Sequence, residues 1–188
     1  MKYYCAAPSV CYNLASQRGF KNMPLTRLDP IDRLILSELQ ANGRMTNVEL
    51  AKRVGISAPP CLRRVRALEE QGFINGYHAQ VDERSLGFEV KVFAMVGLQS
   101  QAEADLSSFE ELCKQWPLVR ECHMLNGEVD FMLKCVAPDL SSFQSFLTGE
   151  LLTAQNVGSV KTSLVIRGAK DDPGVPFDIL EERLAKQA

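Results

Sequence analysis

No uninterrupted run of about 18 apolar residues occurs in this sequence of 188 residues, and a membrane-spanning helix needs about that length. The six cysteines form no CxxC pair, and neither histidine lies at a metal-binding spacing from a cysteine. We recognise no glycine-rich phosphate loop and no set of nucleophile, base and orienting group. We therefore expect no membrane segment, no metal, no cofactor and no catalytic residue, and we expect reduced cysteines, as in a cytoplasmic protein.

The net charge of −2 hides an uneven distribution of charge along the chain. Residues 44–66 carry six basic side chains and one acidic side chain, whereas residues 101–150 carry three basic and nine acidic ones. At roughly 150 residues per domain, the length suits one large domain or two small ones. A basic module joined to an acidic one indicates that the N-terminal half binds a polyanion while the other half has a different task.

The segment 28–71 carries start and stop signals for three helices. The first and third starts combine a capping residue with an early proline, and the second has the capping box Thr-x-x-Glu. The expected caps are Asp29, Thr46 and Ser57, and the helices end at Asn42-Gly43, at Gly55 and at Gln71. Only a few residues separate the second helix from the third, so the two must cross sharply, as in a helix-turn-helix.

The third helix keeps a basic face with short side chains beside it. Leu62, Val65 and Leu68 fall on one side at 100° per residue, and Arg63 points nearly opposite. A DNA major groove accepts such a face, although many basic triplets are only solvated surface. The expected DNA contacts are Thr46, Asn47, Ser57, Pro59, Pro60, Arg63, Arg64 and Arg66.

Residues 73–81 read as two short strands around Asn75-Gly76, a strong signal for a type I′ hairpin. Three helices followed by a hairpin make a winged helix-turn-helix, which we place at 25–82. We expect residues 1–24 to be a disordered or non-native leader and residues 83–89 to be a linker.

An internal repeat organises the second half of the chain. The sequence Asp-Leu-Ser-Ser-Phe occurs at 105–109 and again at 139–143, each time between two apolar strands. The strands are expected at 90–98, 118–125, 129–136 and 157–166. The order β-α-β, β-α-β predicts a ferredoxin-like domain at 90–168 and an α+β protein overall. A tail at 169–188 follows, with a short helix at 177–186.

Two features of this second module suggest binding partners. The strand 90–96 is apolar on both faces, and a second copy of the sheet would cover the free face, so we expect a homodimer. The turn at Asn126-Gly127 offers backbone N–H groups to an anion, and Asp130 offers a carboxylate to an ammonium group. This pair suits a zwitterion such as an amino acid, and a plain hairpin with a solvated Asp130 is the alternative.

The assembled pattern resembles the leucine-responsive regulatory protein and AsnC (Lrp/AsnC) family of prokaryotic transcription regulators, and its leucine-responsive branch more than AsnC. The resemblance covers about residues 28–168. The residues that carry it are 28–36, 46–55, 57–69 and 76–77 in the first module and 121–124 and 127–131 in the second.

The resemblance implies a DNA-binding domain joined to an amino-acid-sensing domain, in dimers that assemble into octamers or similar rings. It places a leucine-like effector where dimers meet, at Met124, Leu125, Asn126, Gly127 and Asp130, with Thr162 from the neighbouring dimer. The expected function is a sequence-specific regulator, associated with the nucleoid, whose assembly or DNA affinity responds to the amino acid. A non-specific architectural protein that wraps DNA is the alternative.

Overall fold

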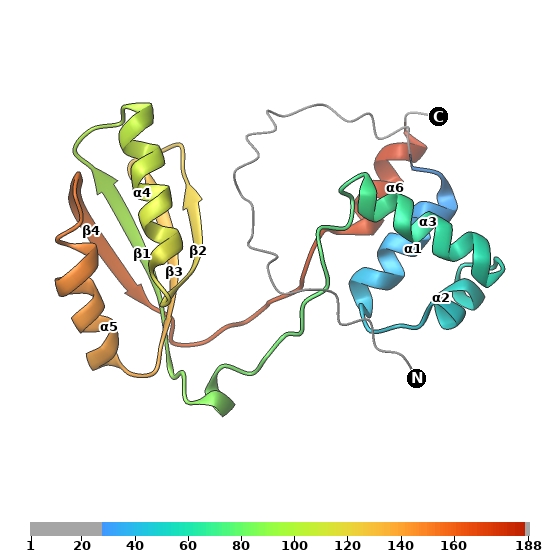
Figure 1. Ribbon diagram of the computed structural model, residues 1–188, viewed down its shortest axis with the longest axis horizontal. Coiled ribbons are helices and arrows are strands. Elements are labelled where there is room, and N and C mark those ends of the chain that lie inside the picture. The colour runs from blue at the N-terminus through green and yellow to red at the C-terminus, as the bar shows by residue number, and fades with distance from the viewer. Residues whose placement is uncertain (1–27, 187–188) are drawn as a thin grey trace. The chain divides into compact units, whose positions relative to one another are not determined.

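The computed structural model describes residues 28–186, which form two compact units (Figure 1). The expected leader at 1–24 lies outside the described residues. The first unit contains α1 (Pro30–Ala41), α2 (Asn47–Arg53), α3 (Ala58–Glu70) and α6 (Phe177–Ala185). The second contains β1 (Val90–Leu98), α4 (Glu103–Gln115), β2 (Val119–Met124), β3 (Phe131–Ala137), α5 (Leu140–Phe146) and β4 (Val157–Leu164). Within 28–186, no helix is both long and apolar enough to cross a membrane.

The first three helices form where the capping signals predict them. The side chain of Asp29 accepts a hydrogen bond from the Asp32 N–H at 2.8 Å, and the Thr46 hydroxyl accepts one from the Glu49 N–H at 3.2 Å. These caps satisfy N–H groups that the first turn of a helix leaves unpaired. The helices enclose a small core, whose buried members are Ile35, Leu50, Ala51, Val54, Cys61 and Leu68.

The expected hairpin at 73–81 is not formed, because residues 74–82 have no ladder partner in the structure. A type I′ turn needs positive φ at both central residues, and Asn75 does not have it. Tyr77 instead folds back on the helices, since its hydroxyl donates to Glu69 Oε1 at 3.0 Å. The segment therefore leaves α3 as an extended connection rather than as a closed wing.

The second unit is an antiparallel four-stranded sheet in the order β2-β3-β1-β4, the order of a ferredoxin-like fold. Helices α4 and α5 cover one of its faces (Figure 1). The two copies of the sequence repeat differ in detail: Asp139 caps α5 by accepting the Ser142 N–H at 2.7 Å, whereas Asp105 is the third residue of α4. The expected architecture is confirmed, and the repeat is approximate.

Aromatic rings fill the space between the sheet and its helices. Phe131 is fully buried, and its ring centroid lies 4.9 Å from that of Phe109 on α4. Trp116 packs edge-on against Phe146 at 5.3 Å, which connects α4 to α5. Such contacts add to the burial of large apolar surfaces, so this cluster holds both helices on the same face of the sheet.

Replacement of Phe131 with alanine should lower the free energy of unfolding by about 3–5 kcal/mol, because it leaves a cavity under α4. Leu140→Ala is the control: this side chain is 59% exposed, and the expected loss is below about 0.5 kcal/mol. Denaturant-induced unfolding measures both. Equal losses in the two variants would show that Phe131 is not central to the core.

Candidate nucleic-acid interface and effector site

Helix α3 presents an exposed basic face. Arg63 and Arg66 are exposed, and neither forms an ion pair with any residue in the described range 28–186. Ser57 and Pro59 are exposed at the start of the same helix. Two guanidinium groups free to reach outwards, next to short side chains, match what a helix needs to enter a DNA groove.

Two further exposed cations come from the elements before α3. Lys52 on α2 and Arg44 in the turn before it form no ion pair within the part of the chain that the structure describes. Arg53, in contrast, binds both Glu38 and Glu49. Arg44 and Lys52 are not among the DNA contacts expected from the sequence, although both contribute to the positive charge of residues 44–66.

Arg64 has a different environment from Arg63 and Arg66. Its Nη1 lies 2.6 Å from Asp29 Oδ2 and 2.7 Å from Asp32 Oδ1, so the guanidinium joins α3 to the N-terminus of α1. Burial alone would raise the pKa of the Asp29 carboxyl, but the Asp32 N–H and the Arg64 guanidinium outweigh it and hold that pKa below its usual value. Asp29 therefore stabilises the fold at neutral pH, and this contribution is lost as the pH falls through the lowered pKa.

The start of α3 lacks the side-chain cap that we expected from Ser57. A capping hydroxyl accepts a hydrogen bond from the second or third residue of the helix, and these are Pro59 and Pro60, which have no N–H. Asn47 secures the turn instead, because its Nδ2 donates to the Ala58 carbonyl at 2.9 Å. Ser57 is therefore exposed without a capping hydrogen bond, whereas the side chains of Thr46 and Asn47 are hydrogen-bonded within the helix-turn-helix.

Of the predicted effector residues, Met124 ends β2, and those from 125 to 130 lie in the open loop that follows; we call the two together the loop 124–130. Asn126-Gly127 does not form a tight turn: the loop runs from residue 125 to residue 130 and is closed by the Leu125 N–H, which donates to the Asp130 carbonyl at 2.8 Å. Met124 is 61% exposed, and the side chains of Leu125 and Asn126 are exposed with it. The backbone N–H groups of residues 126–128 donate to no group within residues 28–186.

The Asp130 carboxylate is not simply solvated, because it holds the end of β1. Its Oδ2 accepts the Leu98 N–H at 2.7 Å, and its Oδ1 accepts Gln101 Nε2 at 2.7 Å. A carboxylate has about four acceptor positions, so an ammonium group can still bind to it. No periodicity or motif marks Gln101 as part of this site, because the contact depends on how two loops meet in the folded sheet.

Thr162 lies away from this loop within one chain. Thr162 is on β4 and pairs with Ala94 on β1, and β4 and β2 are opposite edges of the sheet. Its neighbour Lys161 does reach the loop, since Lys161 Nζ lies 3.0 Å from Glu128 Oε1 and lowers the pKa of that carboxyl. The ion pair connects the last strand to the predicted effector loop.

An exposed basic helix in a helix-turn-helix unit, followed by a ferredoxin-like unit with an open loop after β2, is the arrangement expected of a ligand-binding transcription regulator. Two family models match the chain: residues 28–75 match the winged helix-turn-helix DNA-binding model, and residues 91–175 match the Lrp/AsnC ligand binding domain. The chain belongs to the Lrp/AsnC family, as a DNA-binding transcription regulator with an amino-acid-binding domain.

Similar proteins agree with this assignment. The leucine-responsive regulatory protein of Rhizobium meliloti is 56% identical over 144 residues, which is 77% of this chain and 92% of the relative. That of Escherichia coli K12 is 41% identical over 150 residues, 80% and 92% of the two chains. A Neisseria meningitidis transcriptional regulator in complex with L-Met superposes with a TM-score of 0.77 at 35% identity, covering 81% of this chain and 99% of that one.

Arg63→Gln and Arg64→Gln each remove one positive charge from α3 and should affect DNA binding differently. Log affinity falls as log salt concentration rises, and Arg63→Gln should make this slope shallower by about 0.9, because one phosphate contact is lost. Arg64→Gln should leave that slope unchanged and lower the thermal unfolding midpoint, because Asp29 and Asp32 lose their partner. Titration of a mixed-sequence duplex at several salt concentrations separates the two. An equal loss of slope in both variants would mean that Arg64 also contacts DNA.

Proposed function

We propose that the regulator senses a small apolar amino acid, of the leucine or methionine kind, at the loop 124–130. The proposal is carried by two kinds of group in the same loop. The backbone N–H groups of residues 126–128 donate to no group within the described residues, and the Asp130 carboxylate lies at the end of the loop. The N–H groups suit the carboxylate of the ligand, and Asp130 suits its ammonium group. The exposed apolar side chains of Met124 and Leu125 suit an apolar ligand side chain.

The comparisons support the class of ligand. The relatives with 56% and 41% identity are named leucine-responsive regulatory proteins, and the solved Neisseria regulator contains L-Met. Asn126 and Gly127 then belong to the part of the open loop that receives the ligand's carboxylate. Thr162 lies on β4, at the opposite edge of the sheet from β2, and its side chain points to the other face from that of Lys161, so we assign its contribution to a neighbouring copy of the chain.

We also propose how the DNA interface divides its work. Ser57, Pro59, Arg63 and Arg66 contact DNA, whereas Arg64 holds α3 in position. Thr46, Asn47 and Pro60 shape the start of the two helices. The exposed residues Arg44 and Lys52 add phosphate contacts. This division follows from which side chains are already bound within the fold.

The regulator acts in our proposal as a homodimer that assembles further into octamers or similar rings, on the nucleoid in the cytoplasm. On the sheet face opposite α4 and α5, Phe93 and Met95 are only partly buried within one chain. The sheet of a second copy would cover them. The dimer would then bring two copies of α3, the proposed recognition helix, to one duplex. The relatives are transcriptional regulators, and the proposal assigns this chain no catalytic activity.

Thermal unfolding against a panel of the common amino acids tests the effector site. L-leucine or L-methionine at 100 times its dissociation constant should stabilise the protein by about 2.7 kcal/mol and raise the unfolding midpoint. Asp130→Asn should abolish this shift, because an amide binds an ammonium group less well than a carboxylate does.

Glu128→Gln is the matched control, since it removes one acidic charge from the same loop and should keep the shift. An undiminished shift in Asp130→Asn would exclude Asp130 from the site. The absence of a shift with every amino acid would contradict the proposed class of effector.

A further inference from the structure

The C-terminal segment 173–186, which we call the clasp, belongs to the first unit rather than forming a free tail. Its helix α6 lies in the same unit as α1 (Figure 1). The two helices are bound through Arg33 and Glu181, whose Nε and Oε1 atoms lie 2.6 Å apart, with a second contact from Nη2 to Oε2 at 3.3 Å. The Arg33 side chain is only 15% exposed, and its Nη1 also donates to the Leu28 carbonyl at 2.9 Å. Two-point contact with a largely buried guanidinium sets both the position and the orientation of α6.

A second contact fixes the start of the clasp. Gln40 Nε2 donates to the Val175 carbonyl at 2.8 Å, and the Val175 N–H donates to Gln40 Oε1 at 2.9 Å. Gly174 makes this approach possible, because its φ of +76° disfavours other residues and a Cβ there would overlap the Gln40 amide. The clasp therefore contacts α1 near both ends of that helix, at Arg33 and at Gln40.

The same helix α1 holds the recognition helix. Asp32, the residue before Arg33, and Asp29 bind Arg64 of α3. Helix α1 and its capping residue are thus bound to both the clasp and α3 through charged side chains.

The clasp is also continuous with the ligand-binding unit. Strand β4 runs into it through residues 165–172, and Lys161 on β4 is paired with Glu128 of the predicted effector loop. A chain of contacts and covalent bonds therefore runs from the effector loop through β4 and the clasp to α1 and α3. It is separate from the connection at 71–89, which joins α3 to β1 directly.

We propose that the clasp transmits the state of the ligand-binding unit to the recognition helix through α1. The transmission half of this proposal rests on the proposed function, because it takes the loop 124–130 as the effector site. The mechanical half does not: the clasp holds α1, and through α1 it holds α3, whether or not an effector is bound.

Glu181→Ala in the full chain tests the mechanical half, with Glu182→Ala as the matched control. Both remove one acidic charge from the same turn of α6, and Glu182 is exposed with no side-chain partner in the described residues. Hydrogen exchange of 173–186, of α1 and of α3 (58–70) should accelerate about two- to fivefold in Glu181→Ala and stay unchanged in Glu182→Ala. Faster exchange of 173–186 with unchanged exchange of α3 would overturn the proposal.

Gly174→Ala loosens the clasp at its other end, without touching a charge, and should reproduce the same pattern of exchange. If it accelerates exchange in 173–186 alone, α1 does not pass the change on to α3, and the proposal fails. Agreement of the two variants would show that the docking of the clasp, and not the charge of Glu181, protects α3.

DNA titration of the wild type and of Glu181→Ala, with and without L-leucine and L-methionine, tests the transmission half. We expect the amino acid to change the DNA affinity of the wild type and to change that of Glu181→Ala at least threefold less, although both proteins bind it equally in calorimetry. An equal change in the two proteins would overturn transmission through the clasp. If neither amino acid binds the wild type, the proposed effector is wrong, and the exchange of α3 still decides whether the clasp holds the recognition helix.

Discussion

The recognition helix of this protein depends on one guanidinium group shared by two carboxylates. Because Pro59 and Pro60 remove the N–H groups that a capping side chain needs, α3 cannot be secured at its start by a local cap. Asn47 secures the turn before α3, and Arg64 restrains the helix itself by binding Asp29 and Asp32 at the start of α1. Asp29 also caps α1, so one residue sets both where α1 begins and how α3 lies on it. The exposed face that carries Arg63 is directed outwards by this arrangement.

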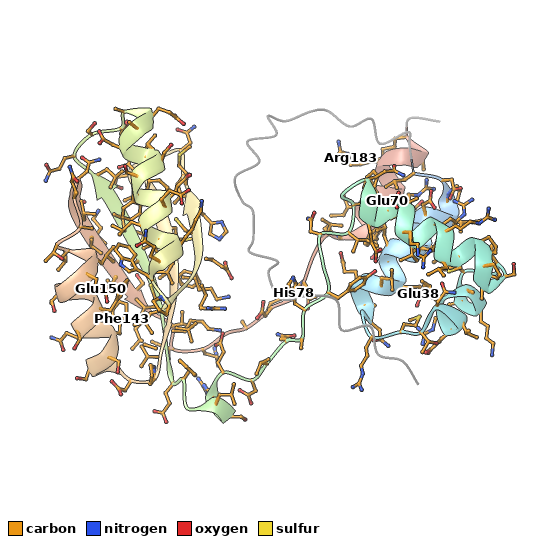
Figure 2. The ribbon with its side chains drawn as sticks, viewed as in Figure 1. Glu38, Glu70, His78, Phe143, Glu150 and Arg183 are labelled. Atoms are coloured by element: carbon orange, nitrogen blue, oxygen red, sulfur yellow. The ribbon has the colours of Figure 1, made fainter. Side chains whose placement is uncertain are left out.

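The ligand-binding unit uses a carboxylate in a comparable way. Asp130 holds the end of β1 and the side chain of Gln101, and it also closes the loop that we propose for the effector (Figure 2 shows the side chains of this unit). An ammonium group at Asp130 would share the carboxylate with Gln101. Binding of the proposed effector at Asp130 would therefore be coupled to the position of the β1–α4 connection, which is the kind of coupling that a regulator needs.

The elements could be predicted from the sequence wherever local rules decide the structure. The caps Asp29 and Thr46, the period of the apolar residues and the strand at 90–98 all lie where expected. The prediction of a hairpin at 73–81 was wrong, because Tyr77 binds Glu69. This contact holds the segment against the helices instead of leaving it to pair with a second strand. The predicted side-chain cap at Ser57 does not form, because Pro59 and Pro60 occupy the positions whose N–H groups would donate to the hydroxyl.

The site was harder to predict than the fold, because its geometry depends on contacts between distant segments. Arg63 and Arg64 are adjacent and chemically identical, yet only Arg64 meets the carboxylates of α1. Nothing local to the sequence marks Gln101 as a partner of Asp130, or Gln40 as a partner of Val175. Such pairs become visible only when the fold brings together residues that are far apart in the chain.

In the proposed dimer, this protein reads a particular DNA sequence through a pair of α3 helices. Selection of bound duplexes from a random-sequence pool, followed by sequencing, is the sharpest test of this reading. We expect enrichment of an inverted repeat whose half-sites lie about 10 base pairs apart or a multiple of that, as two helices related by a dimer axis require. Retention of the pool without any enriched motif would contradict it and would favour a protein that wraps DNA regardless of sequence.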